Sequence, residues 1–313
     1  MSTGPTVDWS AALLRALLFV PGNDRRKLAR AGTVGADMIV IDLEDAVAEA
    51  EKTAARAVAS EAIAALAPAS LVAVRVNGVE SHRLEDDIAA VTRPGLAAVV
   101  VPKVEDLDTL ARADRALSET ERAHELQDGA TGLLAILETP RGIARSEEIL
   151  FGAPARTITA LFGLADFAAA LGVELTDEGD ELFYARARLI VAARAAGLAA
   201  PIDGPFLRVD DLDGLLADSQ RARAAGFQGR LALHPRQVEP IQRAFSDLSE
   251  EQVAAARKVV EAFEGAEASG VASIRVDGQF VDYPLYNMAR AKLRRYEAYR
   301  AAAPEAYRAA APR

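Results

Sequence analysis

The chain has 313 residues, of which 51% are hydrophobic and 26% are charged, and this is enough apolar material for one large core. Its formal net charge of −10 argues against a nucleic-acid partner, because the neutralisation of phosphates requires a basic face. The absence of cysteine excludes disulfides, thiolate metal sites and cysteine nucleophiles.

Eight short runs rich in Val, Ile and Leu recur along the chain, and each is followed by a longer alanine-rich segment with scattered charges. The runs are residues 17–21, 38–44, 72–77, 98–103, 133–138, 158–164, 200–203 and 230–235. Continuous apolar runs are typical of parallel strands that are buried on both faces. The segments between them, such as 46–67 and 181–196, have apolar positions at helical spacing. The repeat of roughly 30 residues is the size of one βα unit.

Eight such units predict an α/β fold, a (β/α)8 TIM barrel, over residues 12–245. An open, doubly wound sheet is the alternative, because the seventh run is weak. No apolar run reaches the roughly 18 residues of a membrane span. The N-terminal segment also lacks the basic start and long apolar centre of a signal peptide, so we expect a cytoplasmic protein with no membrane partner.

A C-terminal extension is predicted to follow the barrel over residues 246–300. It contains a predicted helix at 250–264 and a basic helix from about 285 to 300. Between these helices, Asp277-Gly278 indicates the turn of a hairpin. We expect a lid-like helical element, followed by a flexible, alanine-rich tail at 301–313.

Polar side chains stand at the ends of nearly all the predicted strands. They are Asp42, Glu44, Asp45, Arg75, Asn77, Lys103, Glu105, Glu138, Asp166, Asp203 and His234. In a TIM barrel, catalytic groups lie at the C-terminal ends of the strands. Each carboxylate alone could be a helix N-cap or a structural ion pair, but the whole set indicates a catalytic rim.

Two of these carboxylates, Glu138 and Asp166, follow adjacent strands and could share a divalent cation. Clustered carboxylates repel one another unless they are protonated or neutralised. The ligands available are oxygens, which favour Mg²⁺, with Mn²⁺ as a substitute. An ion held by two side chains keeps positions open for substrate and can stabilise an enolate. Arg75 could bind a substrate carboxylate through its planar fork or pair with Glu44 or Asp45, and these roles are compatible.

Eight motifs occur in a fixed order along the chain. They are PGN (21–23), DLEDAV (42–47), RVNG (75–78), PKVE (102–105), ETPRG (138–142), GLADF (163–167), DGP (203–205) and HPRQ (234–237). The ordered set resembles the citrate lyase β-subunit-like group of the HpcH/HpaI aldolase superfamily, over about residues 15–295. That group includes malyl-CoA, β-methylmalyl-CoA and citramalyl-CoA lyases.

The resemblance implies a role for each matching residue in the mouth of the barrel. Glu138 and Asp166 would be the metal ligands, and Arg75 would contact the oxygen atoms of the substrate. Glu44 and Asp45 would lie near the metal-bound water and this arginine.

The resemblance also implies a CoA site and a lid. The segment 19–30 is similar to the loop and helix that receive CoA, with Phe19, Arg25 and Arg30 as the implied contacts. Asp24 departs from some relatives, which have a basic residue there. Asp282 matches a lid aspartate that reaches the active site of a neighbouring subunit.

The activity implied is that of a Mg²⁺-dependent carbon–carbon lyase. Such an enzyme cleaves a 3-hydroxyacyl-CoA thioester, for example malyl-CoA, methylmalyl-CoA or citramalyl-CoA, into an acyl-CoA and glyoxylate or pyruvate, or forms it by a Claisen-type condensation. The alternatives are a malyl-CoA thioesterase, a citrate lyase β subunit acting on citryl-acyl carrier protein, a metal-dependent aldolase acting on free oxo acids, and a non-catalytic acyl-CoA-binding barrel.

The apolar side chains of the extension indicate an oligomer. Phe280, Tyr283, Leu285 and Tyr286 would be exposed to solvent on an isolated tail, and apolar patches beside a catalytic rim are typical of interfaces and closing lids. With the resemblance, this predicts a homotrimer or hexamer whose lid crosses to the next barrel.

Overall fold

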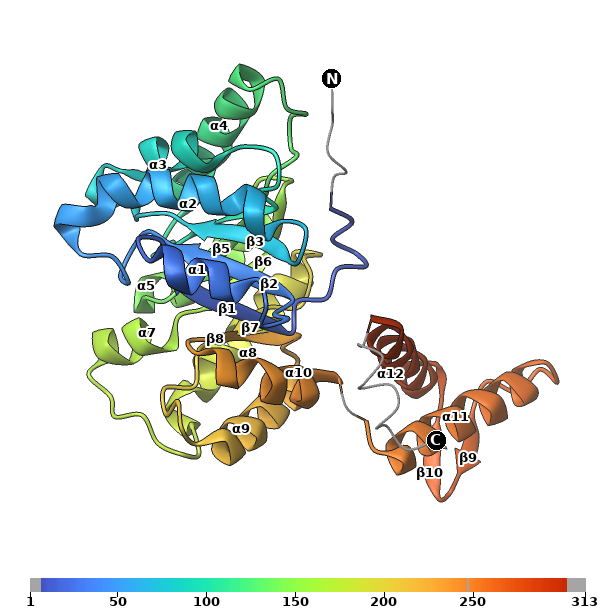
Figure 1. Cartoon of the computed structure of the whole chain (residues 1–313). Helices are drawn as coiled ribbons and strands as arrows, with labels where there is room; N and C mark the ends of the chain where they lie inside the picture. Colours follow the sequence, from blue (N-terminus) through green and yellow to red (C-terminus); the bar gives the residue numbers. More distant parts are fainter. Residues whose placement is uncertain (1–6, 247, 303–313) are drawn as a thin grey trace. The chain divides into compact units, whose positions relative to one another are not determined.

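The computed structural model describes residues 7–246 and 248–302 (Figure 1). The chain divides into two compact units, Met1–Phe245 and Ser246–Arg313. None of the helices in the described residues has the length and apolar character needed to cross a membrane. The predicted tail at 301–313 lies outside the described residues from position 303 onward, so its flexibility stays a prediction.

The first unit is a closed barrel of eight parallel strands, which confirms the predicted fold and excludes the open sheet. The strands are β1 (Ala16–Pro21), β2 (Met38–Asp42), β3 (Leu71–Arg75), β4 (Ala98–Val101), β5 (Gly132–Leu137), β6 (Thr157–Phe162), β7 (Ile202–Asp203) and β8 (Gly229–Ala232). They are hydrogen-bonded in sequence order, and β1 pairs with β8 to close the ring. The weak seventh run is indeed the shortest strand, with two residues.

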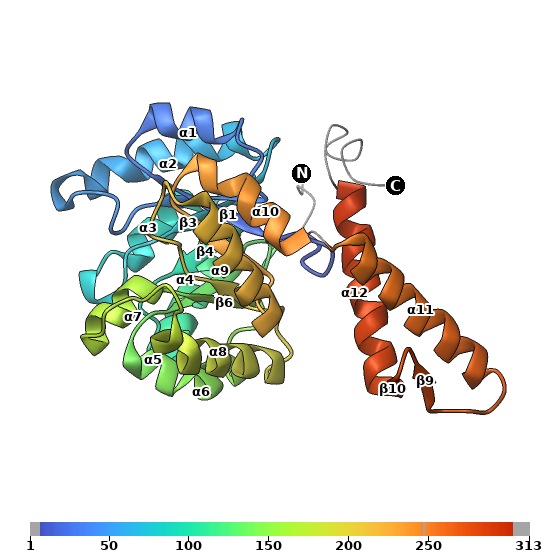
Figure 2. The same cartoon turned by 90° about the horizontal axis from the view of Figure 1, so that it is seen from below.

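Helices cover the outside of this barrel (Figures 1 and 2). They are α1 (Arg25–Ala31), α2 (Lys52–Leu66), α3 (Leu84–Val91), α4 (Leu107–Ala123), α5 (Pro140–Ala144), α6 (Ser146–Phe151), α7 (Leu164–Leu171), α8 (Phe183–Ala195), α9 (Leu212–Ala225) and α10 (Val238–Ser246), with short 3-10 turns at Glu49–Glu51, Val79–Ser81, Asp180–Leu182 and Pro235–Gln237. Aspartates cap several of them: Asp24, for example, begins α1 by accepting the Lys27 N–H, and Asp106 begins α4 by accepting that of Thr109.

Alternate residues of each strand pack on opposite sides of the barrel wall. Val40 and Ile136 belong to the buried cluster inside the barrel, whereas Ile41 and Leu137 belong to the larger cluster between the strands and the helices. Because both faces are buried, the strands are apolar at nearly every position, which is why continuous apolar runs predicted them.

The second unit contains α11 (Glu250–Glu267), the hairpin of β9 (Ile274–Val276) and β10 (Gln279–Val281), and α12 (Tyr283–Ala302). Asp277 and Gly278 form the predicted turn, and both have positive φ, 49° and 84°. Such values are those of a type I′ turn, which Asp-Gly favours. The ring of Tyr286 stacks on Phe263 with 4.8 Å between centroids, and both are buried in the small core of this unit.

Candidate active site

Charged side chains gather where the strands β2 to β5 end. Asp42 and Arg75 are the last residues of β2 and β3, and Glu138 directly follows β5. Each stands two positions after an inward-facing apolar residue (Val40, Ala73 and Ile136), so the strand alternation directs it into the barrel mouth.

Arg75 is the centre of an ion-pair network in this mouth. Its Nε and Nη2 donate to the two carboxylate oxygens of Asp42 at 2.7 and 2.6 Å. Its Nη1 lies 3.0 Å from Glu44 and 3.5 Å from Asp45. Burial alone would lower the pKa of Arg75, but the hydrogen bonds to Asp42 and the surrounding carboxylates outweigh it and raise this pKa further. The guanidinium is therefore charged and held in one orientation.

Asp42 also shapes the loop that follows β2, because the same two oxygens accept the backbone N–H groups of Glu44 at 2.9 Å and Ala46 at 3.1 Å. This turn places Glu44 in the buried part of the mouth, whereas the Asp45 side chain is 54% exposed. Sequence reasoning noted Asp42 as a polar strand end but did not assign it to the site.

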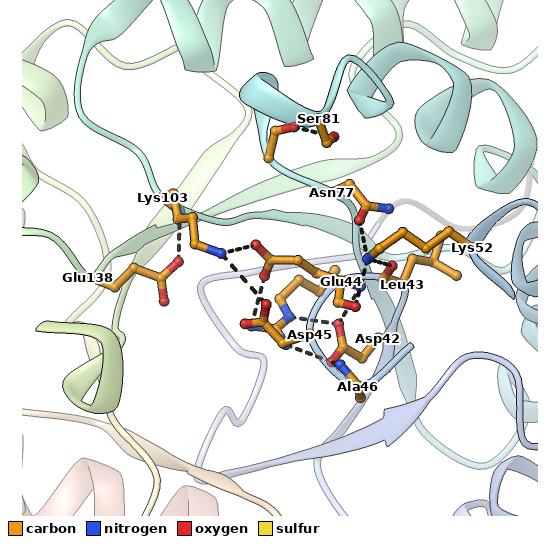
Figure 3. A network of polar contacts seen from close by, with 12 residues as sticks. Asp42, Leu43, Glu44, Asp45, Ala46, Lys52, Asn77, Ser81, Lys103 and Glu138 are labelled. Carbon is orange, nitrogen blue, oxygen red and sulfur yellow. Dashed lines mark hydrogen bonds and ion pairs between the residues drawn. The ribbon is translucent and has the colours of Figure 1, made fainter. Parts of the chain in front are cut away.

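Lys103 is a second cation of the mouth and was also not assigned from the sequence. Its ammonium donates to Glu44 at 2.5 Å and lies 3.7 Å from Asp45, and its backbone N–H donates to Glu138 at 2.8 Å (Figure 3). Burial favours a lower pKa for the ammonium, but the contact with Glu44 prevails and raises it. Burial also raises the pKa of Glu44, although Arg75 and Lys103 oppose this.

Lys52, at the start of α2, holds the loop after β2 by hydrogen bonds to its backbone. Its ammonium donates to the carbonyl oxygens of Leu43 and Glu44 at 3.1 and 2.8 Å, and to the Asn77 side chain at 2.6 Å (Figure 3). Asn77 in turn donates its backbone and side-chain N–H groups to the buried carboxylate of Asp87. Sequence reasoning missed Lys52, because a lysine in a helix nine residues after Leu43 has no distinguishing signal.

Glu138 is buried, with 2% of its surface exposed. Burial, together with the negative charges of Glu44 and Asp166, raises its pKa to about 8. Gly163 makes room for this side chain: a Cβ at position 163 would lie 2.3 Å from the Glu138 Cβ and from its Oε2. Asp166 follows in the first turn of α7, which Gly163 begins. The two predicted metal ligands therefore lie at the ends of the adjacent strands β5 and β6, near enough for the charge of Asp166 to act on Glu138.

The residues of the mouth fit a hard divalent cation. No cluster of three or more His, Cys, Asp or Glu side chains that could hold a metal occurs in residues 7–246 and 248–302. A site built on Glu138 and Asp166 would therefore take its other ligands from water or substrate, as an open catalytic site does. The raised pKa of Glu138 is the effect expected where a carboxylate lacks a compensating cation.

One of the predicted strand-end residues lies elsewhere, and another has a structural role. Asp203 does not face the mouth: it is fully buried outside the barrel wall, where it pairs with Arg186 of α8 and Arg230 of β8. Asp218 of α9 contacts both arginines, so the four charges form one buried network. The prediction that Asp203 belongs to the rim was wrong. His234 caps the 3-10 turn at Pro235–Gln237 by accepting the Arg236 N–H, so it has a structural hydrogen bond.

The residues predicted to contact CoA are not gathered at one point. Phe19 lies in the mouth, with the Arg75 guanidinium 5.2 Å from its ring centroid. Arg25 is exposed at the start of α1 and pairs with Glu61, and Arg30 is exposed in the last turn. Asp282 belongs to the second unit, where its carboxylate accepts a long 3.4 Å hydrogen bond from Leu285 N–H at the start of α12.

The fold and its charged mouth define the chain as a barrel enzyme, and comparison with known proteins identifies the class as carbon–carbon lyases. The family model described as HpcH/HpaI aldolase/citrate lyase matches residues 15–235. Citrate lyase subunit beta from Haemophilus influenzae is 34% identical over 284 residues, which cover 90% of this chain and 97% of that protein. The mitochondrial citramalyl-CoA lyase of Homo sapiens is 31% identical over 287 residues, 88% of this chain and 83% of that protein. The chain therefore belongs to the HpcH/HpaI aldolase/citrate lyase family.

A solved structure agrees with this assignment. The crystal structure of the protein CitE from Mycobacterium tuberculosis in complex with magnesium, acetoacetate and coenzyme A superimposes with a TM-score of 0.71 at 28% identity. The match covers 92% of this chain and 99% of that chain, so it extends beyond the barrel into the C-terminal unit. The predicted family is confirmed.

Proposed function

We propose that the protein is a Mg²⁺-dependent lyase that cleaves a 3-hydroxyacyl-CoA thioester, such as malyl-CoA, methylmalyl-CoA or citramalyl-CoA, into an acyl-CoA and glyoxylate or pyruvate. The observation that carries this proposal is that Glu138 packs against Gly163, which begins the helix of Asp166, and lies close enough for the charge of Asp166 to raise its pKa, in a mouth that also contains the rigidly held Arg75. The similar CitE protein, which was crystallised with magnesium, acetoacetate and coenzyme A, supports the choice of ion and ligand.

Glu138 and Asp166 would hold the ion. When bound, Mg²⁺ supplies Lewis-acid stabilisation of the oxygen atoms on which negative charge develops. Arg75, whose orientation is fixed by Asp42, would add a positive charge in the same mouth. Since Asp42 occupies Nε and Nη2, the long contact of Nη1 with Asp45 is the one that a substrate carboxylate would replace.

The reaction requires two proton movements. The substrate hydroxyl loses its proton as its C–O bond becomes a carbonyl and the neighbouring C–C bond breaks, and the electron pair of that bond passes to the acyl-CoA as an enolate. The hydroxyl proton would pass to the acidic mouth, where Asp45 is the exposed carboxylate of the Glu44–Asp45 pair. Asp282 would protonate the enolate carbon, or remove a proton from acetyl-CoA in the reverse direction.

An open cavity of about 500 Å³ at the start of α1 is the place we propose for part of the CoA. Arg25 and Lys27 line it and would neutralise phosphate charges, while Asp24, which also lines it, would oppose them. Phe19 and Arg30 are not among the residues that line this cavity, so we propose that they contact other parts of the CoA.

We also propose that the enzyme is a homotrimer or hexamer in which Asp282 of one chain serves the barrel of another. Phe280 and Tyr283 support this, because they are 61% and 45% exposed on the C-terminal unit. Tyr286 and Leu285 do not, because they pack against the core of that unit.

A product assay tests the activity. With Mg²⁺, the purified protein should convert malyl-CoA or citramalyl-CoA into acetyl-CoA and glyoxylate or pyruvate, and EDTA should stop it. The double variant Glu138→Ala, Asp166→Ala should be inactive, whereas the exposed Glu125→Ala should behave as the wild type. Unchanged turnover of the double variant would refute the metal assignment.

Mixing two inactive variants tests the subunit arrangement. Asp282→Ala and Glu138→Ala proteins, mixed under conditions of subunit exchange, should recover activity if one chain lends Asp282 to another. No recovery after demonstrated exchange would place Asp282 in the site of its own chain.

A second candidate is the β subunit of a citrate lyase complex, which would act on an acyl carrier protein in place of CoA. The 34% identity to the Haemophilus influenzae subunit over 90% of the chain favours it. Turnover of a CoA ester by the isolated chain would argue against this dependence. In the same assay, free thiol released without an oxo acid would indicate a thioesterase, cleavage of free hydroxy-oxo acids would indicate an aldolase, and tight acyl-CoA binding without turnover would indicate a non-catalytic barrel.

A further inference from the structure

Lys103 has a backbone conformation that lysine rarely adopts. Its φ is +51°, in the left-handed region that glycine and asparagine occupy more readily. Residues held in such conformations cost on the order of 1 kcal/mol or more and persist where the surrounding structure requires them. The position directly follows Pro102 at the end of β4, in the mouth of the barrel.

This conformation lets a single residue contact two carboxylates with different atoms. The backbone N–H of Lys103 donates to Glu138 Oε1 at 2.8 Å, and its ammonium donates to Glu44 Oε1 at 2.5 Å (Figure 3). Lys103 thus connects the ends of β2 and β5, which are not neighbours in the barrel.

Gly163 bounds Glu138 on its other side. The remaining oxygen, Oε2, lies where a Cβ at position 163 would come within 2.3 Å, so this oxygen rests against the backbone that begins α7. Asp166 is in the first turn of the same helix. One oxygen of Glu138 is therefore committed to Lys103, and the other lies near the helix that carries the second carboxylate.

We infer that Lys103 is a positioning residue: its left-handed backbone orients Glu138 so that Oε2 is offered to the metal beside Asp166, and its ammonium holds Glu44 against Arg75. The inference rests on the proposed Mg²⁺-dependent function and adds a residue to it. The two roles belong to different parts of Lys103, so they separate experimentally.

Three substitutions distinguish the backbone role from the side-chain role. Lys103→Asn removes the ammonium but accepts the left-handed conformation, whereas Lys103→Val removes the ammonium and, being β-branched, resists that conformation. Lys103→Arg keeps the charge. Mn²⁺ is the probe, and its dissociation constant is measured on the full-length protein by calorimetry, beside kcat and KM for the CoA ester.

We expect Lys103→Asn to bind Mn²⁺ within about threefold of the wild type and Lys103→Val at least tenfold more weakly, because only the latter displaces the N–H that orients Glu138. Both should lower kcat at least tenfold, and Lys103→Arg should recover part of it. Equal Mn²⁺ affinities for the Asn and Val variants would overturn the backbone role. A wild-type kcat in Lys103→Asn would overturn the side-chain role.

Glu125→Val is the matched control, because Glu125 also has a positive φ, 55°, but is exposed and lies beyond α4, away from the mouth. It should lower the melting temperature and leave Mn²⁺ binding unchanged. Lys103→Thr, β-branched but polar, replaces the valine variant if that protein does not fold. Wild-type protein that binds no Mn²⁺ would refute the proposed function itself, and this inference with it.

Discussion

Lowering the pH from 9 to 6 is expected to weaken Mg²⁺ binding about 100-fold, because the ion and a proton compete for Glu138. Burial and the charges of Glu44 and Asp166 raise the pKa of this carboxyl group to about 8. At pH 7 about nine tenths of the metal-free protein should therefore have Glu138 protonated, and at pH 9 about one tenth. Each bound ion should release about 0.9 proton at pH 7 and about 0.1 proton at pH 9.

The same raised pKa affects the stability of the metal-free protein. The folded state binds the proton of the Glu138 carboxyl group more tightly than the unfolded chain does. The stability that this proton contributes is therefore fully present below the ordinary pKa of 4.5 and is lost as the pH rises to about 8. At 1.36 kcal/mol per pH unit, the loss is up to about 5 kcal/mol. Saturating Mg²⁺ should restore stability at pH 8, where the ion replaces the proton as the neutralising charge.

Calorimetric titration with Mg²⁺ in two buffers of different ionisation enthalpy counts the protons released, and repeating it at several pH values gives the affinity. Glu138→Gln is the control. Its amide binds no proton between pH 6 and 9, so the Mg²⁺ affinity that remains in this variant should not fall about 100-fold over that range. Two results would refute this account of the site. One is Mg²⁺ binding to the wild type at pH 7 without the release of protons, and the other is a Mg²⁺ affinity that does not change between pH 6 and 9.

Three further substitutions test separate parts of the molecule. Gly163→Ala places a Cβ 2.3 Å from the metal-binding glutamate and should weaken Mg²⁺ binding at least tenfold by calorimetry, whereas Gly265→Ala, which meets open space, should not change it. Arg75→Lys removes the two-bond contact with its aspartate and should lower kcat about 100-fold in the product assay with an unchanged circular dichroism spectrum; near-wild-type kcat would contradict the role of the planar fork. Asp203→Asn removes the negative charge that pairs with Arg186 and Arg230, so it should lower the free energy of unfolding in urea by about 3 kcal/mol and leave KM unchanged. An unaltered urea midpoint would show that this ion-pair network contributes little to stability.

Periodicity and turn chemistry were sufficient to predict the barrel and the hairpin. The strands are buried on both faces, so their apolar runs are uninterrupted, and the Asp277-Gly278 pair is one of the few that accept positive φ at two successive positions. The placement of Glu138 and Arg75 in the mouth was also predictable, since they continue the inward-facing alternation of β5 and β3.

The errors and omissions arose where a single position decides the outcome. Strand β7 has only two residues, which is too short for a sequence pattern to predict whether Asp203 faces the barrel interior or the helices. A polar residue at the end of a strand is compatible with either side. The sequence gives no indication that Lys103 is left-handed, because this conformation follows from its contacts and not from its residue type. The position of Lys52 depends on how α2 packs against the loop after β2, which is a tertiary property.

The buried charges beside β7 also constrain how the family can vary. Strand β7 has one register pair with β6 and two with β8, and the contacts among Asp203, Arg186, Arg230 and Asp218 add ion pairs that connect β7 to β8 and to the helices α8 and α9. Replacing one of the four residues leaves a buried charge without its partner and lowers the free energy of unfolding by about 3–5 kcal/mol. Replacing all four by apolar residues of similar volume would change this free energy little. Single substitutions should therefore be rare at these four positions, and homologous barrels should either keep all four charges or have replaced them together.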